Sequence, residues 1–125
     1  MGEQFDASRP IYAQLVERLK AKILAGSYPP GRHLDSVRDL AAAAGVNPNT
    51  MQRALAQLEN EGLVRTERTA GRYVTEDTAL IEQLRTEAAQ KLAEEFLGKM
   101  RGIGYSPARI AALLEQLSTT KEDAQ

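Results

Sequence analysis

Polar side chains with the chemistry to recognise DNA base edges gather at the start of one predicted helix. Asn49 and Thr50 fall in its first turn, and Arg53 follows about one turn later. Short amide and hydroxyl groups can contact phosphates and base edges, and an arginine can donate two hydrogen bonds to a guanine. Asn47, just before the helix, is a typical cap that can contact DNA as well. Arg53 could instead pair with Asp39 or Glu59, which would remove it from this set.

A second group of side chains suits the DNA backbone. Arg38 lies on the predicted helix that precedes the one carrying Asn49, and Arg68 and Arg72 lie near the tip of a predicted hairpin. Guanidinium groups bind phosphate oxygens strongly. Arg65 adds to the basic face of the hairpin. Taken alone, Arg38 is better explained as a solvated surface residue or a partner of Asp39, and only the motif around it favours a phosphate contact. Charges on exposed strands are usually solvating too, but three arginines with only Glu67 among them favour DNA.

Two short helices joined by a tight turn are predicted to carry the first group. Ser36 is a typical N-cap of the first helix, and Gly45 is suited to end it in the left-handed conformation. Pro48 fits the first position of the second helix, where a missing N–H costs nothing. The apolar face of the second helix recurs at helical spacing and comprises Met51, Ala54, Leu55 and Leu58.

A hairpin is predicted after these helices. Strand-like runs at residues 63–68 and 72–75 flank a turn at Thr69-Ala70-Gly71. Two helices followed by a hairpin describe a winged helix-turn-helix, in which the second helix enters the major groove. A helix over residues 11–25 and a short strand over residues 32–34, joining the hairpin sheet, complete this unit. We predict that it spans residues 1–76.

Residues 77–125 are predicted to form a pair of helices, so that the whole chain is mostly α with a small antiparallel β wing. The pattern is strongly helical over residues 79–101, and Ser106-Pro107 starts a last helix of about a dozen residues, with residues 118–125 expected to fray. The long helix has an apolar stripe too wide for one short helix to cover. Because burying a Leu or Phe is worth about 1.5–3 kcal/mol, we expect a two-fold dimer. The alternative is a monomer whose helical pair folds back on the front unit.

Composition excludes several classes of function. The chain has no Cys and one His, so a thiol or transition-metal site lacks ligands. No nucleophile motif, phosphate loop or paired carboxylate predicts catalysis, and we expect neither an enzyme nor a cofactor. The sequence shows no secretory signal and no apolar run near the roughly 20 residues that span a bilayer, which favours the cytoplasm.

The charge distribution is mildly asymmetric. The net charge is −1, with ten Lys/Arg and eight Asp/Glu in residues 1–75 and six and nine in residues 76–125. The positive excess of the front part suits contact with DNA. The acidic pI of about 5.9, with Asp35 and Thr69 near the expected contact surface, leaves an alternative. In that alternative the chain is a helical dimerisation or adaptor module whose winged helix contacts protein.

The motifs between Arg9 and Val74 closely resemble the GntR superfamily of bacterial transcription regulators. The matching pieces, in order, are Pro10-Ile11-Tyr12-Ala13-Gln14, Gly26-Ser27-Tyr28-Pro29-Pro30-Gly31, Leu34-Asp35-Ser36-Val37-Arg38-Asp39-Leu40-Ala41, Gly45-Val46-Asn47-Pro48-Asn49-Thr50, Arg53-Ala54, Leu58-Glu59, Glu61-Gly62-Leu63-Val64 and Gly71-Arg72-Tyr73-Val74. Two positions depart from the family pattern, because Asp35 replaces a usual proline and Thr69 a usual glycine. The short tail resembles the YtrA-like subfamily.

The resemblance implies a homodimeric regulator, usually a repressor, that binds an operator and often controls a transport operon. It also implies specific DNA contacts. Arg38 matches the backbone contact of the first helix. Four residues match the front of the recognition helix, namely Asn47, Asn49, Thr50 and Arg53, while Arg68 and Thr69 match the wing tip and Arg72 lies just beyond it. A small-molecule effector acting through the tail is a further expectation, and no residue indicates its identity.

Overall fold

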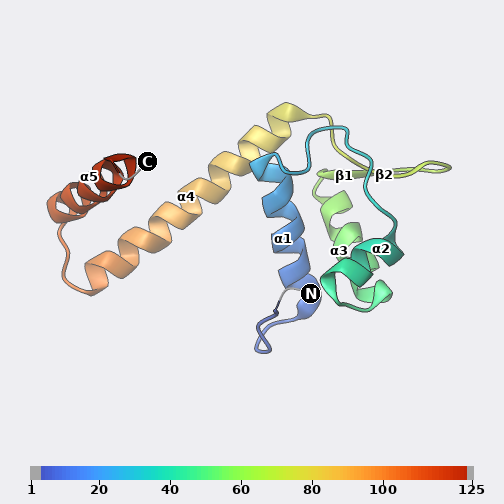
Figure 1. Cartoon of the computed structure of the whole chain (residues 1–125), viewed down its shortest axis with the longest axis horizontal. Coiled ribbons are helices and arrows are strands. Elements are labelled where there is room, and N and C mark those ends of the chain that lie inside the picture. Colours follow the sequence, from blue (N-terminus) through green and yellow to red (C-terminus); the bar gives the residue numbers. More distant parts are fainter. Residues whose placement is uncertain (1–3, 124–125) are drawn as a thin grey trace. The chain divides into compact units, whose positions relative to one another are not determined.

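The computed structural model describes residues 4–123, with side chains to residue 120. The elements follow in the order α1 (Ile11–Ala25), α2 (Val37–Ala44), α3 (Pro48–Asn60), β1 (Val64–Glu67), β2 (Gly71–Val74), α4 (Thr78–Gly102) and α5 (Pro107–Asp123) (Figure 1). The predicted fold class, a winged helix-turn-helix with a C-terminal helical pair, is confirmed. The chain divides into two compact units within α4, Met1–Arg85 and Thr86–Gln125. The predicted domain boundary after residue 76 stays a prediction.

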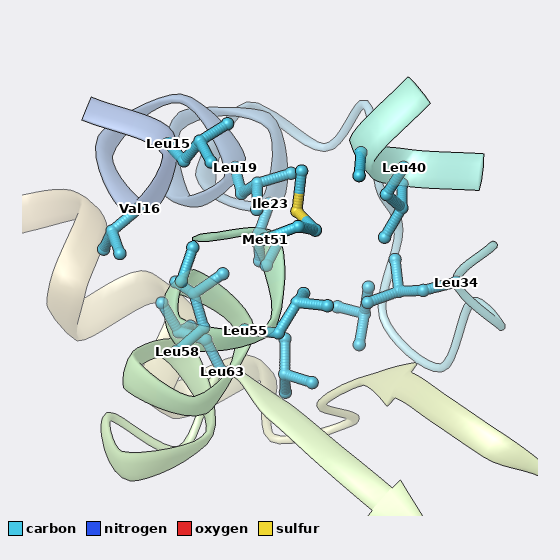
Figure 2. Close-up of a cluster of buried hydrophobic side chains, with 14 of the residues drawn as sticks. Leu15, Val16, Leu19, Ile23, Leu34, Leu40, Met51, Leu55, Leu58 and Leu63 are labelled. Atoms are coloured by element: carbon cyan, nitrogen blue, oxygen red, sulfur yellow. The ribbon is translucent and has the colours of Figure 1, made fainter. Parts of the chain in front are cut away.

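The front unit is built around one apolar core. Leucine and isoleucine side chains of α1 face the apolar side of α3, where Met51, Leu55 and Leu58 are at most 1% exposed (Figure 2). Leu34 and Leu40 close the core from the connector and from α2. Because the core occupies one side of α3, the opposite side of that helix is left for solvent or a ligand.

Helix ends in the front unit are fixed by the residues that the sequence indicates. The Ser36 hydroxyl accepts a hydrogen bond from the backbone N–H of Asp39 at 3.1 Å, and Asn47 Oδ1 accepts one from the N–H of Asn49 at 2.7 Å. Gly45 ends α2 with φ +71°, a conformation that glycine adopts without steric cost. Gly45 and Asn47 thus define the tight turn between α2 and α3.

In the hairpin, here called the wing, the first strand is shorter than predicted and the second begins one residue earlier. Its strands pair antiparallel from Val64 opposite Val74 to Glu67 opposite Gly71. Residues 32–34 do not form the expected strand. They make one isolated bridge between His33 and Tyr73, supported by the N–H of Leu34 donating to the carbonyl of Arg72 at 2.9 Å. The predicted pairing is therefore present, but it is too short to count as a third strand.

The tail helices are longer than the periodicity indicates. The N–H of Leu80 donates to Asp77 Oδ1 at 3.0 Å, so Asp77 caps α4. Helix α5 continues to Asp123, so the prediction that residues 118–123 fray is wrong, and residues 124–125 lie outside the described part. The large apolar side chains of this tail that remain exposed are Leu92, Phe96, Ile103, Leu114 and Leu117. No helix within residues 4–123 is both long and apolar enough to cross a bilayer.

Candidate nucleic-acid interface

The exposed side of α3 carries the predicted base-contacting residues. Asn49 and Arg53 are exposed and Thr50 is half-buried, while the core residues point to the opposite side. Asn47 is exposed too, and its Oδ1 is engaged in the cap. Its amide NH₂ group is the donor that a ligand would meet. The structure thus presents all four predicted residues of the recognition helix at or near one end of α3.

Arg53 packs against Tyr12, which the sequence did not place at the DNA-facing surface. Its Cζ atom lies 3.7 Å from the centre of the Tyr12 ring, at the start of α1. Among the described residues Arg53 has no ion pair or side-chain hydrogen bond, so the alternative of a pair with Asp39 or Glu59 is wrong. Tyr12 and Arg53 are far apart in the sequence, and no local spacing could have indicated their contact.

A depression of about 420 Å³ opens beside this stacked pair. It joins the start of α1 to the start of α3, and its lining residues are Pro10, Ile11, Tyr12, Asn49, Thr50 and Arg53. Three of the predicted base-contacting residues therefore share one concave surface. A concave surface at a helix tip, with polar groups from α3 beside the apolar residues of α1, can admit a base edge or a phosphate.

A buried glutamine holds the chain that leads into this depression. Gln14 is 3% exposed, and its Nε2 donates to the carbonyls of Asp6 at 2.7 Å and Arg9 at 3.0 Å. Its Oε1 accepts from the N–H of Asp6 at 2.8 Å. The hydroxyl and N–H of Ser8 donate to the Asp6 carboxylate and hold the pKa of Asp6 below its ordinary value. The segment before Tyr12 is thereby tied to α1.

The predicted backbone-contacting residues differ in their surroundings. Arg38 and Arg68 are exposed and have no ion-pair or hydrogen-bond partner in the part of the chain that the structure describes. Thr69 is also exposed at the wing tip. Arg72 is only half-buried, but its Nε atom is enclosed without a hydrogen-bond partner among the described residues. Arg68 is thus the wing arginine whose charge is open to a phosphate.

Arg65 contributes less to the basic face of the wing than the sequence indicates. Its guanidinium forms an ion pair with Glu67 and a second one with Glu76 at 3.3 Å, and it also stacks on Tyr73. These carboxylates offset its charge. Glu67 is only two residues from Arg65 in the sequence, whereas Glu76 lies beyond β2 and is brought to Arg65 by the fold.

His33 holds the wing tip, a role that sequence reasoning missed. Its Nε2 atom lies 2.7 Å from the carbonyl oxygen of Ala70, and its ring is 4.8 Å from that of Tyr73. A Cβ atom at position 71 would lie 3.1 Å from His33 Nε2, and Gly71 has φ +92°. Glycine at position 71 therefore avoids both backbone strain at this positive φ and a close contact with the imidazole. Within residues 4–123 no three His, Cys, Asp or Glu side chains gather into a metal site.

Replacing His33 with alanine should weaken binding to DNA by about threefold to tenfold. One hydrogen bond contributes about 0.5–1.5 kcal/mol, and its loss would free the tip that carries Arg68. We expect the same factor for specific and random duplexes, because wing contacts to the backbone carry no sequence information. Fluorescence anisotropy with labelled duplexes measures both affinities. Ser27→Ala, in the exposed connector, is the control, and an unchanged affinity for His33→Ala would contradict the role.

The fold and this surface together define a winged helix-turn-helix protein of the kind that binds DNA. Residues 11–74 match the family described as "Bacterial regulatory proteins, gntR family", and the chain belongs to this family. It is 39% identical over 90 residues to the HTH-type transcriptional repressor YtrA of Bacillus subtilis, covering 70% of this chain and 69% of YtrA. The resemblance inferred from the motifs is thus confirmed.

Solved structures give the same result. A GntR family transcriptional regulator from Listeria monocytogenes is 42% identical with a TM-score of 0.83, covering 90% of this chain and 98% of the other. The DNA-binding domain of AraR in complex with an operator is 27% identical with a TM-score of 0.52, covering 60% of this chain and 88% of that domain. The chain is therefore a DNA-binding transcriptional regulator and not an enzyme.

Proposed function

We propose that this chain is a homodimeric repressor that binds an inverted-repeat operator. The observation that carries this proposal is the polar tip of α3, formed by the exposed Asn49 and Arg53 and the half-buried Thr50, on the side opposite the core. The similarity to a DNA-binding domain solved with its operator supports DNA over the alternative of an adaptor that contacts protein. The similarity to YtrA, named a repressor, supports repression.

In this proposal the DNA contacts fall into two kinds. Asn49, Thr50 and Arg53 contact base edges in the major groove, and Asn47 assists at the helix start. Four residues hold the sugar-phosphate backbone from α2 and the wing, namely Arg38, Arg68, Thr69 and Arg72. Backbone contacts fix the register of the protein on the duplex, and base contacts select the sequence.

The exposed apolar residues of the tail support the dimer. Leu92 is 66% exposed, Ile103 72% and Leu117 57%, each in a helical tail that carries further apolar residues. Contact with the same surface of a second copy would remove them from water, and two-fold dimers are the commonest assembly. Two α3 tips would then enter successive major grooves about 34 Å apart.

The proposed repressor would be controlled by an effector that binds the tail. An effector would act by shifting the tail between two states that hold the α3 tips at different spacings, because a ligand acts only through different affinities for two states. Control of a transport operon rests on the similarity to the YtrA-like subfamily. A repressor of this kind acts in the bacterial cytoplasm, where the chromosome lies.

Two alanine substitutions test the two kinds of contact. Arg53→Ala should relax discrimination at one base pair by about 1–3 kcal/mol, whereas Arg38→Ala should weaken binding to all duplexes alike and reduce the salt dependence. Affinities are measured for the protein's own promoter fragment, its single-base variants and a random duplex over a range of salt concentrations. Arg101→Ala, which removes an exposed arginine from α4, is the matched control.

Two results would contradict the proposal in different ways. An equal loss on specific and random DNA for Arg53→Ala would remove its base-contacting role. Absence of any shift of the promoter fragment at low salt, together with a stable complex with another protein, would favour the adaptor alternative. The salt dependence of the affinity separates DNA binding from the adaptor alternative, because phosphate contacts weaken steeply as the salt concentration rises.

A further inference from the structure

The guanidinium of Arg53 stacks on the ring of Tyr12. At 3.7 Å it is the shortest distance from a guanidinium to an aromatic ring in the part of the chain that the structure describes. The stack joins the first turn of α1 to the first half of α3, and it lies at the edge of the depression beside the α3 tip. An exposed arginine side chain ordinarily samples many rotamers, so this contact restricts where its guanidinium lies.

The chemistry of the stack leaves the hydrogen-bonding capacity of Arg53 intact. A guanidinium stacks on an aromatic ring through its flat face, while its N–H groups lie in its plane and point away. An ion pair with a carboxylate would have occupied those donors. A guanine presents two acceptors, O6 and N7, that match two N–H groups of one guanidinium. An Arg53 stacked in this way therefore keeps its in-plane N–H donors available to a base.

Tyr12 is itself held in place. Its side chain is half-buried and packs against the apolar core of the front unit. The preceding segment is tied to α1 by the hydrogen bonds of the buried Gln14 to Asp6 and Arg9. A ring fixed on one helix can therefore set the direction of an arginine on another.

We propose that Tyr12 is a specificity-determining positioning residue, which orders the Arg53 guanidinium for two hydrogen bonds to one guanine. The proposal rests on the proposed base-contacting role of Arg53. Tyr12 acts through Arg53 and does not itself contact the base. The expected consequence is that Tyr12 and Arg53 control the preference at the same base pair of the operator.

The test compares base preferences of variants of the full-length protein. Wild type, Tyr12→Leu, Tyr12→Phe, Arg53→Ala and the double variant Tyr12→Leu/Arg53→Ala are each used to select duplexes from a randomised DNA library. Affinities for the selected consensus and its single-base variants follow by fluorescence anisotropy. Tyr12→Leu should lower the preference for guanine at the Arg53 position by about threefold to tenfold and leave the other positions unchanged.

Two variants make this expectation specific to stacking. Tyr12→Phe keeps an aromatic face and should retain the preference. The double variant should be no less selective than Arg53→Ala alone, because Tyr12 has no further partner at that base. Tyr28→Leu is the matched control, since Tyr28 also stacks on an arginine, Arg32 at 4.8 Å, away from the α3 tip. It should leave every base preference unchanged.

The outcomes separate this inference from the proposed function. If Arg53→Ala changes one position and Tyr12→Leu leaves that position intact, the inference is wrong and the base-contacting role of Arg53 stands. An equal loss on all duplexes for Tyr12→Leu would also overturn it. If Arg53→Ala changes the base preference at no position, the inference about Tyr12 and the base-contacting role of Arg53 are both wrong.

A second ring variant covers the case in which Tyr12→Leu does not fold. Pentafluorophenylalanine at position 12 keeps the size and shape of an aromatic ring but reverses the charge distribution of its face, which would repel a guanidinium. This protein should show the same loss of preference at the Arg53 position. An unchanged preference in a folded protein would overturn the inference.

Discussion

Replacing Leu92 and Leu117 with glutamate should convert the protein to a monomer and weaken its binding to an inverted-repeat operator by about 10²–10⁴-fold. Both side chains are more than half exposed in the tail. A carboxylate placed in an apolar contact must lose its water without a partner, which opposes association. A monomer engages one half-site at a time and loses the gain from two linked contacts. Sedimentation velocity gives the oligomeric state, and anisotropy gives the affinity.

A matched pair of substitutions controls for added charge. Gln90 and Gln116 are exposed polar residues of the same two helices, and their replacement by glutamate adds the same charge. This control should stay dimeric and keep its operator affinity. A wild-type chain that sediments as a monomer would disprove the dimer, as would Leu92→Glu/Leu117→Glu protein that remains fully dimeric.

Truncating Leu58 to alanine should lower the free energy of unfolding by about 2–5 kcal/mol. Leu58 is 0% exposed on the inner side of α3, so the lost methyl groups leave a cavity between α3 and its neighbours (Figure 2). Urea unfolding followed by circular dichroism measures the change, at one protein concentration because a dimer's stability depends on it.

The exposed surface of α3 provides a control for the loss of stability in Leu58→Ala. Gln52 is exposed on α3, and Gln52→Ala should change the free energy of unfolding by no more than about 0.5 kcal/mol. A similar small change for Leu58→Ala would show that this side of α3 is not the packed one. The assignment of the opposite side to DNA would then lose its structural basis.

Local signals explain how much of the fold the sequence predicts. The bounds of α1 agree to the residue, and Ser36, Gly45 and Asn47 delimit α2 and α3 as expected. Caps and helical periodicity depend on neighbours within a few positions, so a single sequence carries them. The end of α5 was missed because a polar sequence such as residues 118–123 is compatible with either a helix or a frayed end.

Long-range contacts explain what the sequence does not predict. The polar α3 tip followed from its residue types, but the stacking of Arg53 on Tyr12 and the hydrogen bond from His33 to the wing did not. Each joins residues far apart in the chain. The enclosed Nε of Arg72 and the ion pairs of Arg65 likewise depend on how the wing packs.

Methylation protection of the protein's own promoter tests the central claim most directly. Dimethyl sulfate modifies guanine N7 in the major groove, which is where the α3 tip with Arg53 is proposed to lie. The account predicts two clusters of protected guanines centred about 10 base pairs apart, with one guanine in each cluster exposed again in Arg53→Ala protein. A saturated complex that protects no major-groove guanine, or only a single cluster, would contradict it.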